Sequence, residues 1–576
     1  MTYLFNNPVE FADELIEGFV AANGAFVQHV SGGVVRSTIS PAGQVAVVIG
    51  GGSGHYPAFA GIVGQGLAHG AAMGNVFASP STQQIYSVAK AADNGGGVLF
   101  SYGNYAGDVL NFDAAQERLI AEGIPCRTVV VTDDISSASV AEIAKRRGIA
   151  GDLVVFKAAA AAAESGADLD EVWRVADEAN RRTRSFGVAF GGCTLPGAAE
   201  PLFTVPAGRM AVGMGIHGEP GIGEQDIPTA DELAELLVSS LLAELPPEVE
   251  SAAGQSVALI LNGLGAVKYE ELFVLYRRVA QLLDAAGVVV VEPEVGELVT
   301  SFQMAGTSLT LTWLSDELET AWRAPAYTPA FRKGAVVASE ARTGSAEVAS
   351  MHAEVAEATP ESQAAAAGIL RAIEALAAVV DANVDELGRL DSIAGDGDHG
   401  IGMQRGATAA VVAAREAAAA GAGAHTLLAA AGDAWADRAG GTSGALWGLG
   451  LNAIAARIDD STTPRGTDIS AGVRGAIDEV QRFGKAQLGD KTLLDTLIPF
   501  SESLTAGLGN GERFAEAWTR AAEVADAAAE STASLLPRMG RARPHAEKSV
   551  GTPDPGAISM ALIIRAVERT LTTEGE

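Results

Sequence analysis

Three aspartates, Asp391, Asp396 and Asp398, stand within eight residues, in the segment DSIAGDGDHG that spans 391–400. The glycines let the backbone turn tightly, so the three carboxylates can converge on one point. Converging carboxylates repel each other unless a cation lies between them, and Mg²⁺ prefers oxygen ligands and commonly holds substrate phosphates. The alternative is an ordinary solvated turn, because Asp and Gly are common turn residues. The spacing predicts a magnesium site.

A second set of reactive residues lies in the first half of the chain, at glycine-lined loops. His55 closes the turn GGGSGH (50–55), Asp108 follows a later strand-like run, and His217 is flanked by Gly215 and Gly218. The turn lacks the Gly-Lys-Ser/Thr ending of a Walker phosphate loop, so a tight structural turn is the alternative there. One histidine is more often structural than catalytic. Two histidines and an aspartate, each at an open loop, favour a polar small-molecule site.

Further glycine-rich loops in the second half suit a phosphate group. The run GGTSG (440–444) offers backbone amides and the hydroxyls of Thr442 and Ser443, which form a phosphate cradle if they begin a helix. A plain helix–helix turn is the alternative. The segments 489–492 and 554–556 are also plausible turns. Together with the acidic loop, these segments suit a magnesium-bound nucleotide.

The elements that position these loops differ between the two halves. Short β-branched runs at 45–49, 97–102 and 126–131 alternate with helical patterns, and each run ends in a polar loop. This alternation predicts a parallel α/β sheet, in which ligands bind beyond the carboxyl ends of the strands. A second α/β region begins near residue 185 and includes runs at 256–261 and 287–291.

Beyond residue 335 the strand signals stop. Residues 336–362 are rich in Ala, Glu, Ser and Thr and predict an interdomain linker, and residues 363–576 predict amphipathic helices only. We therefore expect an α/β domain at 1–335, with subdomains 1–184 and 185–335, followed by the linker and an all-α domain. The alanine run 158–163 predicts a tightly packed helix.

Bulk composition excludes several classes of function. The chain has 576 residues and a net charge of −32 without a basic cluster, which argues against a nucleic-acid partner. Cys126 and Cys193 are the only cysteines, and their apolar surroundings predict reduced thiols. The N-terminus lacks the pattern of a signal peptide, and no apolar run suggests membrane insertion. These features predict a cytoplasmic protein.

The motifs together resemble the single-chain, ATP-dependent dihydroxyacetone kinases, also called glycerone kinases. The resemblance runs through both halves in order, and its segments are GGGSGH (50–55), GNVFASPS (74–81), GNYAGDVLNF (103–112), CTLPG (193–197), MGIHGEPG (214–221), GDGDHG (395–400), GGTSGALWG (440–448), GDKTLLDTLIP (489–499) and GTPDPGAIS (551–559). It implies an α/β ketose-binding domain of two α/β subdomains. An all-α helical-barrel nucleotide domain, with a lipid-like ligand in its core, is implied to follow.

The same resemblance implies a role for each matching residue. His217 is expected to form a covalent hemiaminal with the ketose carbonyl, and Asp108 to act as general base for the attacking hydroxyl. His55 is expected to assist them, and the substrate pocket to comprise Gly52, Ser53, Gly54, His55, Gly103 and Asp108. The carboxylates of Asp391, Asp396 and Asp398 are expected to hold two Mg²⁺ ions against ATP. The expected nucleotide contacts are Asp398, His399, Gly400, Ile401, Thr442, Ser443, Gly484, Thr492, Leu493, Asp554, Pro555 and Gly556.

Departures from the family pattern bear on the substrate. The family usually continues the first motif with Glu-Pro-Ala-His, where this chain has Tyr56-Pro57-Ala58-Phe59, and usually has Lys where this chain has Gly103. Loss of a lysine side chain opens space, which favours erythrulose, with the D form expected, over dihydroxyacetone as the close alternative. A second alternative is that these residues lie outside the pocket and leave specificity unchanged.

Two other functions and one assembly question stay open at this point. A phosphotransferase-system kinase with permanently bound ADP uses separate chains, so the fusion here favours ATP. A non-catalytic ketose sensor is expected to lose the reactive histidine or the acidic loop, and this chain keeps both. The resemblance also implies a homodimer in which the helical domain of one chain serves the ketose site of the other; docking within one chain is the alternative.

Overall fold

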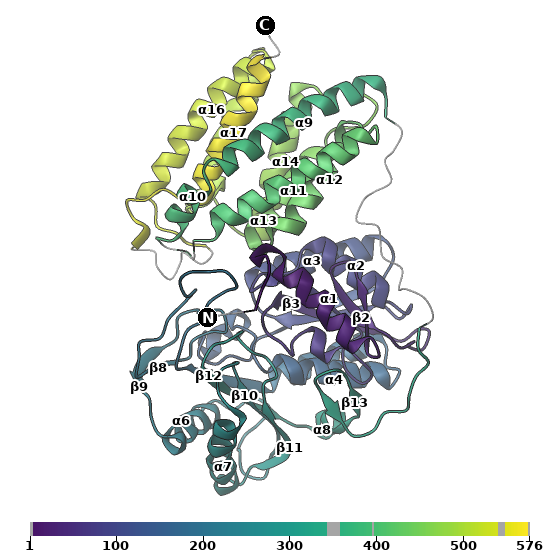
Figure 1. Cartoon of the computed structure of the whole chain (residues 1–576), viewed down its shortest axis with the longest axis vertical. Coiled ribbons are helices and arrows are strands. Elements are labelled where there is room, and N and C mark those ends of the chain that lie inside the picture. Colours follow the sequence, from purple (N-terminus) through teal and green to yellow (C-terminus); the bar gives the residue numbers. More distant parts are fainter. Residues whose placement is uncertain (1–3, 343–357, 394, 396, 540–547, 574–576) are drawn as a thin grey trace. The chain divides into compact units, whose positions relative to one another are not determined.

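The computed structural model describes residues 4–342, 358–393, 395, 397–539 and 548–573. The chain divides into two compact units, Met1–Ala349 and Ser350–Glu576, which are described separately (Figure 1). Much of the expected linker lies outside the described residues. The expected domain boundaries therefore stay a prediction.

The first sheet of the α/β unit has the strand order β1-β2-β4-β3-β5-β6. Strands β4, β3, β5 and β6 run parallel, and β1 and β2 form an antiparallel hairpin at the edge beside β4. The strand bounds are β1 (Val27–Val30), β2 (Gly33–Arg36), β3 (Ala46–Ser53), β4 (Gly70–Val76), β5 (Val98–Gly103) and β6 (Cys126–Val131). The sheet thus places the loops after β3 and β5 at one edge, as expected from the sequence.

Strand β3 shows why this sheet needs helices on both faces. Val47 and Ile49 belong to the core under α4, whereas Ala46 and Val48 belong to the core under α2 and α3. Alternate residues of a strand point to opposite faces, so a run that is apolar at every position is buried on both sides. The helices of this half are α1 (Phe11–Asn23), α2 (Thr82–Ala92), α3 (Ala106–Ala121), α4 (Asp152–Glu164) and α5 (Leu169–Arg181).

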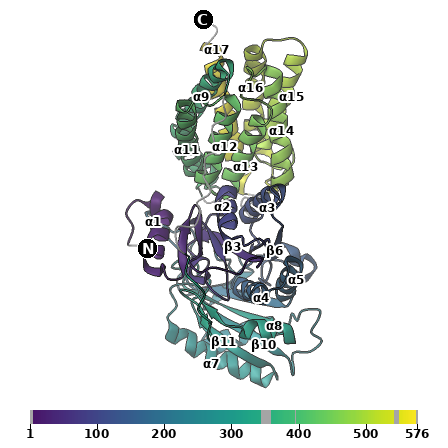
Figure 2. The ribbon, with the colours of Figure 1, turned by 90° about the vertical axis from the view of Figure 1, so that its right-hand side faces the viewer.

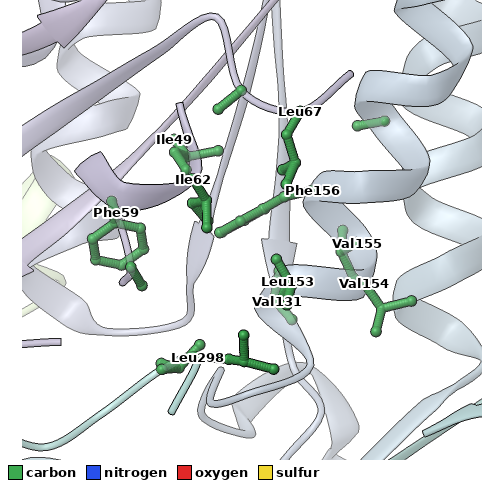
Figure 3. Close-up of a cluster of buried hydrophobic side chains, with 14 of the residues drawn as sticks. Ile49, Phe59, Ile62, Leu67, Val131, Leu153, Val154, Val155, Phe156 and Leu298 are labelled. Carbon is green, nitrogen blue, oxygen red and sulfur yellow. The ribbon is translucent and has the colours of Figure 1, made fainter. Parts of the chain in front are cut away.

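Helix α4 packs directly beneath the strands that carry the site. Its residues Leu153 to Phe156 are almost fully buried, and Figure 3 shows Phe156 reaching toward Ile62 and Leu67. The alanine run that follows lies in the same helix, with Ala158, Ala159 and Ala160 buried. The prediction of a tightly packed helix at 158–163 is confirmed. Small side chains there allow the helix to approach the sheet closely.

The second sheet has the order β11-β10-β12-β7-β8-β9 and is mixed. Only the β10–β11 pair is parallel, while the β10–β12, β12–β7, β7–β8 and β8–β9 pairs are antiparallel. The sequence predicted an α/β region here without assigning a direction to its strands. No helix separates β7, β8 and β9, or β11 and β12, in the chain, and parallel pairing of successive strands requires a crossover.

The elements of the second sheet and its cover complete the unit. The strands are β7 (Thr183–Ala189), β8 (Arg209–Val212), β9 (Gly223–Asp226), β10 (Ser256–Gly263), β11 (Val289–Gly296) and β12 (Gly306–Trp313), with a small hairpin of β13 (Ala326–Tyr327) and β14 (Arg332–Lys333). Helices α6 (Ala230–Leu242) and α7 (Tyr269–Ala285) share one core with this sheet, and α8 (Asp316–Arg323) packs on α4.

The second unit is a closed ring of helices over the residues described. The helices are α9 (Pro360–Asp381), α10 (Val384–Asp391), α11 (His399–Ala419), α12 (Ala424–Ala439), α13 (Gly441–Ala455), α14 (Gly466–Gly484), α15 (Leu494–Gly509), α16 (Phe514–Ser531) and α17 (Pro555–Thr573). From α11 to α17 each helix packs on the next, and α9 packs on both α17 and α11, which closes the ring (Figure 2). The expected all-helical domain is confirmed.

Helix α9 is long and apolar enough to cross a membrane by length and composition alone. It is the only such helix among the residues described. It packs against α11, α12 and α17. A helix packed within a helical bundle can have the same length and apolar composition as a membrane-spanning helix.

Candidate active site

Two histidines from distant parts of the α/β unit meet at the carboxyl edge of the first sheet. His55 follows β3, and His217 lies in the loop between β8 and β9. Their Nε2 atoms are 3.0 Å apart, and Nδ1 of His55 lies 2.7 Å from the carbonyl oxygen of Thr300. The residues that the sequence singled out separately therefore form one site.

Glu219 fixes the orientation of the His217 ring. The Glu219 carboxylate lies 2.9 Å from His217 Nδ1 and also accepts a hydrogen bond from the His217 backbone N–H. Although burial opposes ionisation, His217 and Arg147 hold the pKa of Glu219 below its ordinary value. Arg147 is itself held by Asp134, at 2.9 Å. A charged carboxylate on Nδ1 leaves Nε2 as the atom of His217 that faces the site.

The positions of the protons follow from these partners. A carbonyl oxygen only accepts, so His55 Nδ1 donates to Thr300, and His217 Nδ1 donates to Glu219. One proton must then lie between the two Nε2 atoms. Burial and the adjacent His217 lower the pKa of His55 to about 3, so His55 is the neutral acceptor in this contact.

Aromatic rings enclose the two histidines. Phe77 stacks on His55 at 5.1 Å between centroids and meets His217 edge-on at 5.2 Å. Tyr105 meets the His217 ring at 4.6 Å and 86°. Phe77 has a φ of 56°, a backbone conformation that bulky residues rarely adopt. Phe77 thus packs against both imidazoles, and Tyr105 packs against that of His217.

Asp108 lies in the first turn of α3 and is buried. Burial raises the pKa of its carboxyl group to about 7, against the opposing effects of a hydrogen bond from Ser79 and the charge of His217. Its Oδ1 atom is buried and has no hydrogen-bond partner among the described residues. A buried oxygen without a partner is costly unless a ligand supplies one. A carboxyl group with this pKa can accept a proton near neutral pH.

The other expected pocket residues lie at the same edge of the sheet. The Ser53 hydroxyl donates to the carbonyl oxygen of Gly74 at 2.7 Å, so in this structure its hydrogen serves the backbone. A side chain at Gly52 would lie within 3.0 Å of the backbone of Phe77 and Ala78, and Gly54 has a φ of 101°. Gly103 ends β5. The structure brings these residues together; their contacts with substrate stay a prediction.

Two of the three departures from the family pattern, Phe59 and Tyr56, differ in their surroundings. Phe59 is 5% exposed, and its ring lies 6.3 Å from that of His55. It also fills the space above Gly51, where a Cβ atom would lie 2.5 Å from the ring. Tyr56 is 48% exposed and packs edge-on against Phe19. Phe59 thus borders His55, while Tyr56 is largely exposed to solvent.

The acidic loop of the helical unit joins α10 to α11. Asp391, at the end of α10, accepts a hydrogen bond from Gly397 N–H at 2.8 Å, and Asp398 directly precedes α11. Burial and the negative charge of Asp391 raise the pKa of Asp398 to about 6. The described residues contain no group of three or more His, Cys, Asp and Glu placed to hold a metal. Asp396 lies outside those residues, so the three-carboxylate site stays a prediction.

The expected nucleotide residues lie mainly at helix ends. His399, Gly400 and Ile401 form the first turn of α11, and Thr442 and Ser443 lie in the first turn of α13, as the cradle hypothesis requires. The remaining ones are Gly484, which ends α14, Thr492 and Leu493, which precede α15, Asp554, which precedes α17, and Pro555 and Gly556, which begin it. Helix N-termini carry partial positive charge and free N–H groups, which suit phosphate.

Several of these helix ends adjoin one another. His399 Nε2 lies 3.0 Å from the Ser559 hydroxyl of α17, and a Cβ atom at Gly556 would lie 3.6 Å from Leu493. A cavity is lined by Leu390, Asp391, Ile393, Gly395, Lys491, Pro537, Ser549, Thr552, Pro553, Asp554 and Pro555. Burial, with smaller effects from Asp495 and Asp391, raises the pKa of Asp554 to about 7. Thr442, Ser443 and Gly484 do not line this cavity.

Four residues of the ketose site and one residue of the helical unit were not predicted from the sequence. These are Glu219, Arg147, Tyr105 and Phe77, with Lys491 at the cavity of the helical unit. Glu219 had a usable signal, because it stands two residues after His217 in a glycine-rich loop. Arg147 had none, since only the fold brings it beside the loop. Lys491 was visible in the motif GDKT (489–492).

Comparison with known proteins identifies the family. The sequence matches the Dak1 domain over residues 17–330 and the DAK2 domain over residues 393–569, in one chain. The chain belongs to the dihydroxyacetone kinase family. The resemblance and the fold class inferred from the motifs are confirmed, as is membership of a family of ketose kinases.

Relatives within the dihydroxyacetone kinase family align with almost the whole chain. An L-erythrulose kinase of Pectobacterium atrosepticum is 62% identical over 574 residues, covering 100% of this chain and 97% of the relative. A D-erythrulose kinase of Mycolicibacterium smegmatis is 53% identical and covers 100% of both chains. The crystal structure of the dihydroxyacetone kinase from C. freundii in complex with AMP-PNP and Mg²⁺ covers 99% of both chains, with 28% identity and a TM-score of 0.52.

Proposed function

We propose that this member of the family is an ATP-dependent kinase that phosphorylates a primary hydroxyl of erythrulose while the ketose is held covalently on His217. The observation that supports covalent capture most directly is the contact series from Glu219 through His217 to His55. A carboxylate on one ring nitrogen and a proton acceptor beside the other are the partners that a nucleophilic imidazole requires.

Capture of the ketose is an addition in which no atom is lost. The proton on His217 Nε2 passes to His55 Nε2, 3.0 Å away, and leaves a lone pair on His217. That lone pair forms a bond to the carbonyl carbon, the C=O π electrons move to oxygen, and His55 returns the proton to that oxygen. The low pKa of His55 makes it a ready donor once it is charged. Polyols such as glycerol lack the carbonyl and are excluded.

Asp108 is the proposed general base for the hydroxyl to be phosphorylated. Its pKa near 7 places it close to the operating range of such a base, and its unpartnered Oδ1 is an acceptor for a hydroxyl hydrogen. Phosphoryl transfer leaves little covalent work for the protein beyond positioning, proton removal and charge stabilisation. His217 thus holds the ketose, and Asp108 activates it.

The acidic loop fits a magnesium-bound nucleotide. Burial and the negative charge of Asp391 raise the pKa of Asp398, a repulsion that a divalent cation would relieve, and the helix ends nearby offer N–H groups to phosphates. We propose that Asp391, Asp396 and Asp398 hold two Mg²⁺ ions, whose charge stabilises the phosphates during transfer. The C. freundii relative was crystallised with Mg²⁺ and an ATP analogue, which supports ATP and Mg²⁺ as ligands here.

Erythrulose is proposed over dihydroxyacetone because two full-length relatives, at 62% and 53% identity, are erythrulose kinases. The L form is favoured over the D form expected from the sequence, since the 62% identical relative is an L-erythrulose kinase. Gly103 ends β5 where the family pattern has Lys, and the absence of that long side chain supports a longer ketose.

We also propose a cytoplasmic homodimer in which each chain supplies the α domain to its partner. Two inactive variants test this assembly when mixed under conditions of subunit exchange: His217→Ala, without the ketose anchor, and Asp398→Asn, without a metal ligand. Return of activity is expected, because mixed dimers pair one intact ketose site with one intact nucleotide site. If a mixture shown to contain mixed dimers had no activity, the proposal that each chain supplies its α domain to its partner would be contradicted.

The experiment that tests the catalytic proposal is a coupled kinase assay with Mg-ATP across L-erythrulose, D-erythrulose, dihydroxyacetone and glycerol. The highest kcat/KM is expected for L-erythrulose, and none for glycerol. Preference for dihydroxyacetone over both erythruloses would contradict the substrate, and activity on no ketose would contradict the function.

A further inference from the structure

Two aspartates near the start of α4 differ in the hydrogen bonding of their carboxylate oxygens. Both Asp133 and Asp152 are almost fully buried. Asp133 accepts hydrogen bonds from the N–H groups of Ile149 and Gly151, at 2.8 and 2.9 Å. Oδ1 of Asp152 is buried and has no partner among the described residues. A buried acceptor without a partner destabilises a fold, which suggests that Asp152 serves a ligand.

The carboxyl group of Asp152 faces Gly103, at the end of β5. A Cβ atom placed on Gly103 would lie 3.3 Å from Asp152 Oδ2 and 3.3 Å from Cε2 of Tyr105. A Cβ atom on Gly148 would lie 2.8 Å from Asp152 Oδ1. The two glycines therefore allow the Asp152 carboxyl group to pack closely against the backbone at the end of β5. Any larger residue at 103 would stand between Asp152 and Tyr105.

Tyr105 links this position to the reactive histidine. Its ring lies on one side beside Gly103 and on the other against His217, with 4.6 Å between the ring centroids. The Tyr105 hydroxyl oxygen is also buried and has no partner among the residues described. Asp152, Tyr105 and Asp108 thus contribute three buried oxygens without partners to one neighbourhood of His217. Such a group of oxygens suits a ligand rich in hydroxyls.

We propose that Asp152 is a specificity-determining residue, which hydrogen-bonds the C4 hydroxyl of a tetrulose whose C2 is held by His217 and whose C1 hydroxyl is phosphorylated. Dihydroxyacetone has no fourth carbon, so it leaves Asp152 without a partner. The inference rests on the proposed function, because it assigns one end of the same substrate. It extends that function by naming the protein group that distinguishes four carbons from three.

The protonation of Asp152 fits this role. Burial, together with the charges of Asp133 and Asp108, raises the pKa of Asp152 well above its ordinary value. A protonated carboxyl group both donates and accepts, as a hydroxyl does. A role in stabilising the N-terminus of α4 through the helix dipole is the alternative. Asp133 already binds the amides before that helix, and a dipole contact does not require burial.

The test compares erythrulose, dihydroxyacetone and 1,3-dihydroxybutan-2-one, which is erythrulose without the C4 hydroxyl. Steady-state kcat/KM is measured for the wild type, Asp152→Ala and Asp152→Asn, together with the Tm of each. For Asp152→Ala, the ratio of kcat/KM for erythrulose to that for either analogue is expected to fall about 10- to 100-fold. Asp152→Asn, which keeps a donor and an acceptor, should restore most of the ratio. The Tm of Asp152→Ala should not fall, since it removes an unsatisfied buried group.

The outcomes separate this inference from the function on which it rests. A wild type that is inactive on every ketose overturns the proposed function. If the wild type prefers erythrulose and Asp152→Ala lowers kcat/KM for all three substrates by the same factor, the present inference alone is overturned. A lower Tm of Asp152→Ala together with an unchanged ratio of kcat/KM values also overturns the inference. That result would support the alternative role, in which Asp152 stabilises the N-terminus of α4.

Discussion

The ketose site of the α/β unit and the nucleotide site of the helical unit are built differently. In the first, side chains from separate loops contact one another: His55, His217, Glu219 and Arg147 form a continuous series with partners at 4.0 Å or less. In the second, helix ends and acidic side chains lie near a cavity, and burial together with neighbouring carboxylates raises the pKa of Asp398 and of Asp554. The proposed ketose site is preorganised by its own contacts, whereas the proposed nucleotide site would need a cation to relieve its repulsion.

Of the substitutions proposed here, Asp108→Asn should lower kcat the most. The amide cannot accept the hydroxyl proton, so kcat is expected to fall about 10²- to 10⁴-fold. The ketose should still bind His217, because Asp108 takes no part in capture. A coupled kinase assay measures the first effect, and intact-protein mass spectrometry measures the second. Asp113→Asn, on the same helix, is the control and should be fully active. Undiminished activity of Asp108→Asn would remove Asp108 as the base.

Asp398→Asn tests the helical unit alone. Loss of a metal ligand is expected to lower kcat with Mg-ATP by roughly 10²-fold or more, because metal charge stabilises the transferring phosphate. Ketose capture by the α/β unit should be unchanged. Titration of activity with Mg²⁺ measures the change, and Asp385→Asn, an exposed position in α10, is the control. An unaltered rate and Mg²⁺ dependence would contradict the metal site.

Glu219→Gln tests whether the contacts around His217 are needed. Without the carboxylate, the ring loses its fixed orientation, and ketose capture should weaken about 10- to 100-fold. The loss should appear in the ketose KM and in the amount of adduct, with kcat at saturating ketose less affected. The KM for ATP is the internal control and should not change. A fall in kcat with an unaltered ketose KM would contradict this positioning role.

The pH dependence of kcat/KM for the ketose should report Asp108. With a pKa of about 7, the base is about one-tenth ionised at pH 6 and about nine-tenths ionised at pH 8, so kcat/KM should rise about tenfold between them. The residual activity of Asp108→Asn should lack this rise. A rate that falls as pH increases over this range would assign the base to another group.

Much of this fold follows from local sequence patterns. The runs at 126–131 and 256–261 coincide with β6 and the greater part of β10, because continuous β-branched residues suit buried strands. Strand β4, with the sequence GAAMGNV, carried no such signal and is held by its neighbours β2 and β3. The mixed second sheet was missed because strand direction depends on connections, which periodicity does not encode.

The site was predictable to a lesser extent. Glycine-flanked His55 and His217 pointed to reactive loops, and the 3.0 Å contact between them is a property of the fold. Arg147 and Asp152 carry no local signal, since long-range packing alone places them beside Glu219 and Gly103. Local motifs thus indicate which residues react, and tertiary contacts decide which residues orient them.

The central claim is that the ketose is held covalently on His217. Native mass spectrometry of the wild type and of His217→Ala, each mixed with erythrulose in the absence of ATP, tests it directly. We expect the wild type to gain the full mass of one ketose per chain, without loss of water, on the peptide that contains His217, and His217→Ala to gain none. The absence of this adduct from the wild type, or its persistence in His217→Ala, would contradict the account.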